Sequence, residues 1–572
     1  MSIRDPRLLA LGERYFETQH TYDPYNATLL GIDRFDGLAG DPSLAASESA
    51  AAALAAIGRD VDALDTTGFS DDELADRDVL AVLVRGAQED AEHSLWATNA
   101  SAKGYVSRQG LVFQAVPAMT ANDDVSAARY LSRLGGLAGF FEGLGRRYVE
   151  EAARGRTPTR TGVEQAIAQL QGHLALDASD DALLGPARGA SDPALLDSAR
   201  RIVENEIRPA LRALVDLLRT ELLPVGREGD RVGIHAVPGG DTAYAAAIRR
   251  HTTTDLTAAE IHRIGLDVLD EMLAEWSEVG ERALGEREFP VIAERLRSDP
   301  ALRFETSDEI IAVARGALDR ADAVRDAYFP RTEIPECVIE IINPIDAAGS
   351  ALGYYRPPAV DGSRPGAYCV LATDPEEHFR YEYESLSFHE SVPGHHLQLA
   401  TAQTLDIPRY RRYLDVEACS FNEGWGLYSE QLADEAGLYS DDLSRLGMLS
   451  FRALRACRLV VDTGIHHFGW TRERAVEFMY AHTATTLEHV TSEVDRYIAW
   501  PGQALAYMIG RREILRLREE AREALGDRFS IVDFHGVVLG SGAVPLTVLA
   551  GNVARWQERL LREPLSPTES EK

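Results

Sequence analysis

Cysteine is scarce in this chain. Its 572 residues include only four cysteines, Cys337, Cys369, Cys419 and Cys457. They are widely separated, and no two of them form a Cys-x-x-Cys pair. Disulfide frameworks and thiolate zinc sites both need paired or closely spaced cysteines, so the sequence indicates neither.

Long apolar runs and an excess of basic residues are also missing. No stretch reaches the roughly 18 unbroken apolar residues of a membrane span. The first residues, 1–6, carry charge and proline where a signal peptide has an apolar run, so we expect a cytoplasmic protein. Lys and Arg total 59 against 91 Asp and Glu, a formal charge of −32. Such a surface repels phosphate and anionic lipid, and we expect no nucleic-acid or membrane partner.

Apolar residues at helical spacing dominate what is present. The clearest such segments are 45–65, 124–154, 193–223, 257–287 and 505–525. Thr257 and Glu260 form a capping box at the start of one of them, and Asp299-Pro300 marks the start of a further helix. The sequence therefore predicts a mainly α-helical protein.

The length allows either several small domains or two interlocked helical halves. Turn-rich stretches lie at 225–242 and 343–366, and the second separates a mainly helical first half from the segment with the motifs described below. We place a soft boundary near residue 295. It separates an N-terminal helical lobe, 1–295, from a C-terminal helical lobe, 296–572, which holds the motifs described below.

Two short segments favour strands in this helical background. Cys337–Ile342 is rich in β-branched residues, and Ala367–Ala372 follows a Pro-Gly turn. Their proximity predicts one small sheet. The turn at Asp361–Gly366 leads into the second segment, which we expect to be an exposed edge strand. An extended peptide could pair with such an edge through main-chain hydrogen bonds.

The most informative stretch combines histidine with glutamate. Asp374-Pro375 is a good helix start, and the predicted helix runs into His389-Glu390. A hydrolytic zinc site needs a neutral imidazole nitrogen and a nearby carboxylate that accepts a proton from water. The usual His-Glu-x-x-His spacing is not met, because Pro393 stands four residues after His389.

The second histidine comes later, at His395 or His396. On a regular helix neither could share an ion with His389, since six residues is the wrong face and seven is two turns away. Either could do so if Pro393-Gly394 breaks or widens the helix, because proline removes a hydrogen bond and glycine tolerates unusual dihedral angles.

A third ligand is expected from the segment Asn422–Glu430. Glu423 and Glu430 share one helical face two turns apart, so only one of them can bind the same ion. We choose Glu423 as ligand and regard Glu430 as an outer-shell partner. Gly424 and Gly426 flank Trp425 and would allow a neighbouring backbone to approach closely.

These motifs carry a resemblance. His-Glu-x-x-Pro-Gly-His-His followed by Glu-Gly-Trp-Gly-Leu-Tyr resembles the bacterial family catalogued as domain of unknown function 885, and the likeness extends to Asp23–Thr28 and His251–Thr253. In its metal motifs that family is similar to helical metallopeptidases: Taq-type carboxypeptidases, angiotensin-converting enzyme and thimet oligopeptidase. The resemblance implies a two-lobed zincin-like fold with a deep channel, a small sheet near the active site, bound Zn²⁺ and a peptide substrate. If Pro393-Gly394 is an insertion, His395 is the second ligand.

Three further residues are candidates for the reaction itself. Arg496-Tyr497 resembles a pair in angiotensin-converting enzyme, which implies Tyr497 as the oxyanion donor and Arg496 as a charge that positions it or a substrate group. Alternatively, Tyr497 is a core aromatic and Arg496 a surface ion-pair partner. His466 could donate a hydrogen bond to a substrate carbonyl, although a capping or core role fits equally. His251, His378, His482 and His489 lack partner spacing and are interpreted as structural.

Together these residues predict a zinc metallopeptidase of the carboxypeptidase or oligopeptidase type. His389, His395 and Glu423 hold the metal, and Glu390 takes a proton from water and later delivers it to the leaving amine. Two alternatives stay open: a non-catalytic peptide-binding protein with a degenerate site, and a metal-dependent hydrolase of other amides.

Overall fold

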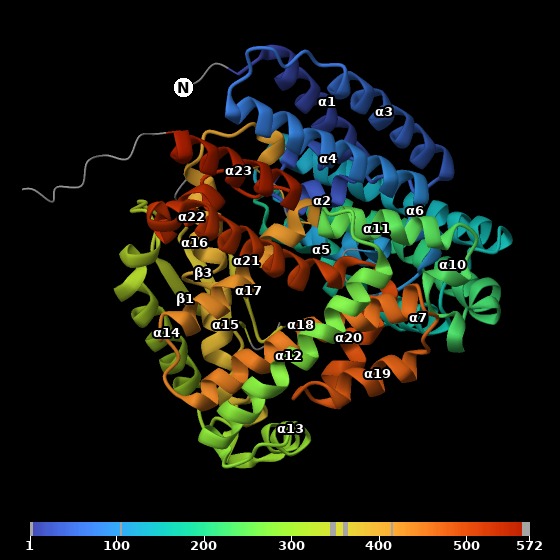
Figure 1. Cartoon of the computed structure of the whole chain (residues 1–572). Helices are drawn as coiled ribbons and strands as arrows, with labels where there is room; N and C mark the ends of the chain where they lie inside the picture. The colour runs from blue at the N-terminus through green and yellow to red at the C-terminus, as the bar shows by residue number, and fades with distance from the viewer. Residues whose placement is uncertain are drawn as a thin grey trace, which may run out of the picture.

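The computed structural model describes residues 4–102, 106–343, 351–358, 364–412, 414 and 416–562. Its elements are overwhelmingly helical, and one three-stranded sheet accompanies them among the described residues (Figure 1). The prediction of a mainly α protein with one small sheet is thus confirmed. Within the described ranges, no helix combines the length and the apolarity needed to cross a membrane.

The helices of the first half are α1 (Pro6–Tyr22), α2 (Pro24–Leu29), α3 (Leu44–Asp62), α4 (Asp71–His93), α5 (Arg108–Ala118), α6 (Asp124–Ala153), α7 (Arg160–Ala175), α8 (Gly185–Gly189), α9 (Pro193–Ile202), α10 (Arg208–Leu217), α11 (Gly240–Thr252) and α12 (Ala258–Leu284). The helix predicted over 193–223 exists as α9 and α10 joined and extended by π-helical turns at Val203–Ile207 and Leu218–Leu222. The capping box of Thr257 and Glu260 opens α12 as predicted.

The second half contains α13 (Phe289–Ser298), α14 (Ser307–Tyr328), β1 (Cys337–Ile341), β2 (Gly353–Arg356), β3 (Gly366–Val370), α15 (Tyr383–Glu390), α16 (His395–Thr404), α17 (Cys419–Glu435), α18 (Asp442–His466), α19 (Arg472–Ala481), α20 (Leu487–Ala499), α21 (Ala506–Leu525), α22 (Ile531–Leu539) and α23 (Leu546–Arg562). The C-terminal α23 contacts α4, so the two ends of the chain lie in one part of the molecule (Figure 1).

Two hydrophobic clusters account for most of the core. One joins buried residues between Tyr25 and Leu222, drawn mainly from α2 and α5–α10. The other runs from Leu8 to Trp556 and takes residues from both sides of residue 295. The division at 295 stays a prediction. The continuous packing across it agrees with lobes that interlock rather than separate.

The sheet differs from its prediction in one respect. β3 lies between β1 and β2, parallel to β1 and antiparallel to β2, and all five of its residues are buried. The prediction that 367–372 forms an exposed edge strand is therefore wrong. The edges of the sheet are β1 and β2. β2 lies within 343–366, a stretch that the sequence analysis interpreted as turn-rich. Residues 361–363 of the predicted turn lie outside the described residues.

Two predicted helix starts also need correction. Asp299 caps only a 3₁₀ turn, Pro300–Leu302, and α14 begins later at Ser307. After Asp374, short 3₁₀ turns at Pro375–Glu377 and Arg380–Glu382 precede α15. The reason is backbone pairing: Phe379 forms a β-bridge with Arg303, which holds this segment extended and delays the helix.

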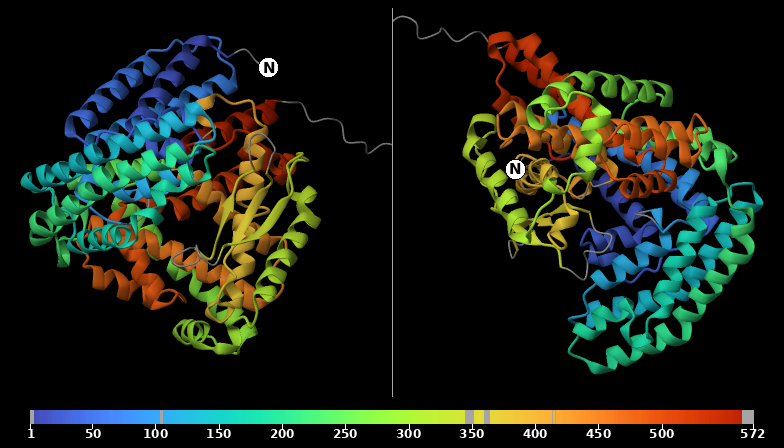
Figure 2. Two further views of the ribbon diagram at one scale, coloured as in Figure 1. Left: turned by 180° about the vertical axis from the view of Figure 1, so that it is seen from behind. Right: turned by 90° about the horizontal axis from the view of Figure 1, so that it is seen from below.

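Long helix pairs frame the region of the motifs. α12 packs along α18, and α17 packs along α21 (Figure 1). The second pair is very close: a Cβ on Gly424 would lie 2.5 Å from the backbone carbon of Gly510. Glycine is thus required at this crossing, as predicted for one of the two residues flanking Trp425. Seen from behind, the sheet stands beside α14 and runs towards these helices (Figure 2).

A cavity of about 1020 Å³, counting space open to solvent, lies where the N-terminal helices meet the segments 416–417 and 499–501. Its wall includes the charged side chains of Asp23, Arg108 and Arg250. The cavity shows that these distant parts of the chain leave a hollow between them next to the start of α17.

Candidate metal centre

The helix that carries the first histidine ends immediately after it. α15 stops at Glu390, Ser391 leaves the helical region, and a new helix, α16, begins at His395. The Val392–Pro393 peptide bond is cis. A Cβ on Gly394 would lie 1.9 Å from the carbonyl oxygen of His389, so only glycine fits there. The break expected at Pro393-Gly394 is present, and it turns His395 back towards His389.

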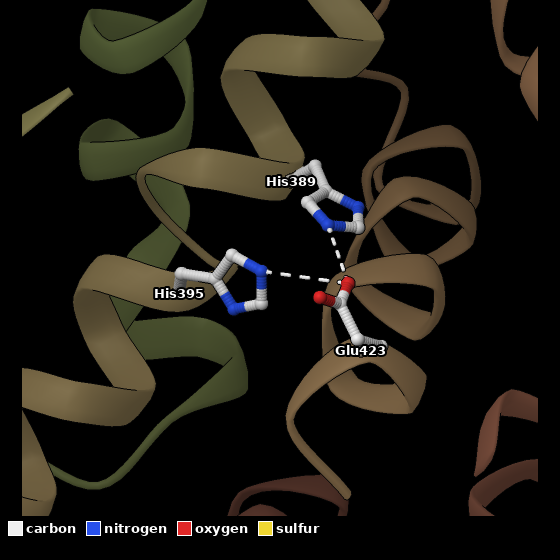
Figure 3. A group of neighbouring side chains, drawn as sticks. All are labelled: His389, His395 and Glu423. Atoms are coloured by element: carbon white, nitrogen blue, oxygen red, sulfur yellow. Dashed lines mark ion pairs between the residues drawn. The ribbon is translucent and has the colours of Figure 1, made fainter. Parts of the chain in front are cut away.

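His389, His395 and Glu423 converge on one point (Figure 3). The Nε2 atoms of His389 and His395 lie 3.4 and 3.8 Å from Oε2 of Glu423. One ligand atom from each residue falls within 4.8 Å of the others. Ligands around a tetrahedral zinc are about 3.3 Å apart, given bonds of about 2.0–2.2 Å. Two imidazoles and a carboxylate at this spacing fit a divalent zinc with little adjustment.

Further side chains orient the two imidazoles. The Nδ1 of His389 donates to Oε1 of Glu430 at 2.8 Å, which directs Nε2 towards Glu423 as the atom that would bind a metal. Ser385 donates to the other oxygen of Glu430 at 3.1 Å. The Nδ1 of His395 lies 3.5 Å from Oε1 of Gln398. Glu430 therefore stands where an outer-shell partner was expected, and it fixes the ring tautomer that metal binding needs.

Neighbouring glycine and tryptophan residues make room for the ring of His389. A Cβ on Gly426 would lie 2.5 Å from that ring, so any larger residue would displace it. The indole of Trp425 donates to the carbonyl of Pro393 at 2.9 Å and ties α17 to the break between α15 and α16. The two glycines thus have different purposes, one at the α21 crossing and one at the imidazole.

The electrostatics of the group suit a cation at its centre. Burial alone would lower the pKa of His389, but hydrogen bonds to Glu423 and Glu430 raise it to about 10. Burial acts against ionisation of Glu423, yet its contacts with the two histidines lower its pKa to about 2. Burial and the charge of His389 lower the pKa of His395 to about 4. The proton on His389 thus occupies a place that a metal ion would fill with greater charge.

Glu390 differs from the other carboxylates of the site. Burial raises its pKa to about 7. It lies next to His389 in sequence, and the backbone of Tyr355 in β2 interacts with its carboxylate. A carboxylate with such a pKa can accept and release a proton near neutral pH.

His396, the other candidate for the second ligand, faces away. Its Nδ1 is 3.0 Å from the hydroxyl of Tyr355, and its Nε2 is 3.0 Å from the carbonyl oxygen of Pro335. Both ring nitrogens are thus engaged beside the sheet. Of the two histidines, His395 joins the group with His389 and Glu423.

The predicted reaction residues Tyr497, Arg496 and His466 are not among the three residues that converge in the metal group. Tyr497 is fully buried, donates to Glu493 at 2.5 Å and accepts from Nε of Arg458 at 3.0 Å. Arg496 binds Glu493 through two nitrogens, both at 3.0 Å. These bonds engage the hydroxyl and the guanidinium within the fold, and the assignment of both residues to the reaction stays a prediction.

His466 has a structural role as well. Its Nδ1 accepts from the backbone of Ile234 at 3.1 Å, and its Nε2 donates to the carbonyl of Tyr497 at 2.9 Å. The side chain is buried. Both nitrogens are thus bound to backbone, and the assignment of His466 to a substrate carbonyl stays a prediction.

Two residues that the sequence interpretation missed lie closer to the metal group. Tyr507 on α21 is half-buried, and Glu423 is the first charge that raises its pKa beyond the effect of burial. The guanidinium carbon of Arg458 lies 4.3 Å from the centre of its ring. The sequence contained a signal for Tyr507. It lies one helical turn before Gly510 and therefore on the face of α21 that α17 contacts. Arg458 stands out as a charge beside the apolar run 459–461.

The chain is similar to a known protein family and to two solved structures. The family model described as "Bacterial protein of unknown function (DUF885)" matches residues 24–553. No curated protein matches the chain. The crystal structure titled "putative lipoprotein from Colwellia psychrerythraea" is 26% identical, with a TM-score of 0.86, over 97% of this chain and 99% of that one. A "putative lipoprotein of unknown function from Shewanella oneidensis" is 17% identical, with a TM-score of 0.76, over 95% and 98%, and shows the same fold.

Proposed function

This chain belongs to the DUF885 family, and from that premise we propose that it is a zinc-dependent peptidase. The observation that carries the proposal is the convergence of His389, His395 and Glu423 with Glu390 beside them. A His₂Glu ligand set is a standard catalytic one for zinc, and it leaves a coordination position open. A two-lobed zincin-like fold with a substrate channel, and a cytoplasmic location, remain parts of this proposal.

Each residue of the site has its own role in the proposed reaction. Zinc bound by the three ligands would lower the pKa of a coordinated water and polarise the scissile carbonyl. Glu390 accepts the proton from water and later delivers it to the leaving amine, for which its pKa of about 7 is well matched. Glu430 keeps His389 in the tautomer that presents Nε2.

We assign to Tyr507 the role of oxyanion donor, which the resemblance implied for Tyr497. An oxyanion needs a donor besides the metal, and the hydroxyl of Tyr507 makes no hydrogen bond within the described residues. Its electrostatic coupling to Glu423 supports a position beside the metal. Arg458, stacked on the Tyr507 ring, adds positive charge where negative charge develops.

The edge strand β2 is the candidate for holding the peptide backbone. It is paired only on its β3 side among the described residues, and Tyr355 within it reaches Glu390. A peptide added along such an edge is held by main-chain hydrogen bonds with little dependence on sequence. The substrate would then lie across Glu390, as attack by water requires.

The direct test is the Glu390→Gln variant, with zinc content measured by atomic absorption and turnover measured on a peptide library. We expect zinc to stay bound while turnover falls by about 10²- to 10⁴-fold, because the variant keeps the ligands and loses the base. Glu377→Gln, on an exposed residue before the α15 helix, is the matched control. Unchanged turnover in Glu390→Gln would refute the proposal.

A further inference from the structure

The cavity beside the start of α17 has polar walls that the proposed reaction does not use. Its volume of about 1020 Å³, counting space open to solvent, is close to the upper end of the range for small-molecule sites. Two stretches noted in the sequence outside the metal motifs, 23–28 and 251–253, meet there, because Asp23, Asn26 and His251 lie in its wall. None of the three residues of the metal group lines this cavity.

Two residues of the wall are buried and keep polar atoms without a partner. His251 is 4% exposed, its Nδ1 is wholly buried without a hydrogen bond, and no described residue bonds to its other ring nitrogen. Gln19 is 9% exposed, and its side-chain amide makes no hydrogen bond within the described residues either. Buried polar groups are normally hydrogen-bonded, because desolvation without a partner is costly. An unpaired imidazole and an unpaired amide in one cavity wall therefore point to a polar ligand.

The end of α11 is held in an unusual conformation that fixes the position of His251. Thr253, two residues further on, has a φ of 52°, in the left-handed region that β-branched residues rarely adopt. Its hydroxyl lies 3.2 Å from that of Ser420 in α17 and accepts from the backbone N–H of Leu546 at 2.8 Å. Such a conformation persists only where surrounding contacts impose it, and these positions cluster at ligand sites. Contacts with two other segments thus hold the imidazole at the cavity.

Charges of both signs face the cavity, and they balance when their direct partners are counted. Among the described residues, six charged side chains lie in the wall: Asp23, Glu89, Asp90, Glu417, Arg108 and Arg250. Arg249 and Arg85 pair with Glu89 from outside this wall, at 2.8 and 3.4 Å, so that four carboxylates meet four guanidinium groups. Burial lowers the pKa of His93 and His251, which therefore add no charge at neutral pH. The wall favours neither a net cation nor a net anion.

Four of these charges form two ion pairs with spare hydrogen-bonding capacity. Arg108 lies 3.2 Å from Asp23, and Arg250 lies 3.4 Å from Asp90. Arg250 has five N–H groups but donates one hydrogen bond among the described residues, to the carbonyl of Gly86 at 3.1 Å. Burial acts to lower the pKa of both arginines, yet Asp23 and Asp90 each help to raise it in both, so the two pairs interact with each other. A ligand that carries an ammonium and a carboxylate group could bond to both pairs at once.

We propose that this cavity binds a zwitterion, namely an α-amino acid with an apolar side chain. Its ammonium group bonds to the carboxylates of the wall, and its carboxylate bonds to the guanidinium groups. The apolar part of the wall, which includes Trp96 and Trp500, receives the side chain. His251 and Gln19 complete the hydrogen bonds of the two charged groups. This site goes beyond the proposed peptidase function and does not depend on it.

The test is calorimetry on the full-length protein with three probes: L-leucine, N-acetyl-L-leucine and L-leucinamide. Leucine carries both charges, and each derivative carries only one. We expect leucine to bind at least about tenfold more tightly than either derivative, since each derivative loses hydrogen bonds between charged groups. Equal or tighter binding of a derivative, or no binding of leucine at millimolar concentration, would overturn the proposal. Binding should be the same with and without added zinc, and binding that needs zinc would place leucine at the metal centre and overturn it too.

Two variants separate ligand binding from a structural role. His251→Phe and Gln19→Leu each remove a polar group that has no protein partner, so the ligand-free protein should not lose stability in urea, while leucine binds roughly tenfold more weakly. His535→Phe is the matched control, because His535 is also buried but has Tyr428 and the carbonyl of Tyr328 as partners, both at 2.7 Å. It should lose stability and keep leucine binding. Unchanged leucine binding in both His251→Phe and Gln19→Leu would overturn the proposal.

Discussion

Two polar groups of the molecule can be compared. The metal group consists of His389, His395 and Glu423, and the Glu493 cluster consists of Glu493, Tyr497, Arg458 and Arg496. Their polar atoms are engaged differently. In the metal group, the Nε2 atoms of two histidines and an oxygen of Glu423 converge, and the proton that Glu423 helps to hold on His389 lies among them. In the Glu493 cluster, every bond is complementary: Tyr497 donates to Glu493, Arg458 donates to Tyr497, and Arg496 donates to Glu493.

The contrast separates a binding site from a structural network. A network that satisfies its own donors and acceptors stabilises the fold and has nothing left for a ligand. A buried group in which two imidazole nitrogens and a carboxylate converge is unfavourable until a proton or a metal cation joins it. The metal group has that second property, and the chemistry that we propose is therefore centred there.

Replacing a ligand should produce the largest effect. In His395→Gln we expect zinc affinity to fall by more than about 100-fold, since even changes around the ligands cost 10- to 100-fold. His396→Gln, the adjacent residue that faces the sheet, should keep its zinc. Metal content after dialysis against a graded chelator measures both variants. Zinc loss in His396→Gln with retention in His395→Gln would reverse the ligand assignment.

Replacing Tyr507 should lower kcat, whereas replacing Tyr497 should lower stability. Tyr507→Phe is expected to lower kcat by about 10²- to 10³-fold with unchanged zinc content and stability, because an oxyanion donor is removed. Tyr497→Phe should keep its kcat and lose about 1–3 kcal/mol of unfolding free energy, because Arg458 and Glu493 lose a buried partner. Steady-state kinetics and urea unfolding of both proteins measure the split. A greater kcat loss in Tyr497→Phe would restore its catalytic assignment.

Features encoded by neighbouring residues could be predicted from the sequence. Helical periodicity and caps gave α3, α6, α12 and α21 within a few residues, and the His-Glu-x-x-Pro-Gly-His motif gave a break that the structure contains. The Glu423 segment followed because two short motifs at a defined distance constrain each other. These helices and the break were predictable because residues close together in the sequence determine their geometry.

Features that depend on distant packing could not be predicted. The bridge from Phe379 to Arg303, which delays α15, joins residues far apart in sequence. β2 lacks a period-2 pattern long enough to identify, and its place at the sheet edge depends on β3. The Arg496-Tyr497 dipeptide carried no information about which side of α20 is buried, and the packing of the helix places Tyr497 on that side.

The smallest predicted effect is the pH dependence that His466 gives to stability. Burial and the nearby charge of Arg227 lower its pKa to about 3, although the bond to the Tyr497 carbonyl opposes this. The unfolded chain binds a proton near pH 6.5, so between 6.5 and 3 the unfolded state holds more protons than the folded state. This contribution is fully present above pH 6.5 and is lost as the pH falls.

Between pH 7.5 and 5 the loss from this one group should be about 2 kcal/mol of unfolding free energy. His466→Gln keeps an amide that can accept from Ile234 and donate to Tyr497 but has no titrating group. Its stability should therefore decline less over that interval, by up to the same amount, although it is lower at pH 7.5. Urea unfolding of both zinc-loaded proteins at the two pH values gives the difference, in which all other titrating groups cancel. Parallel declines would mean that His466 is protonated in the folded protein, and with it the structural interpretation of this cluster would fail.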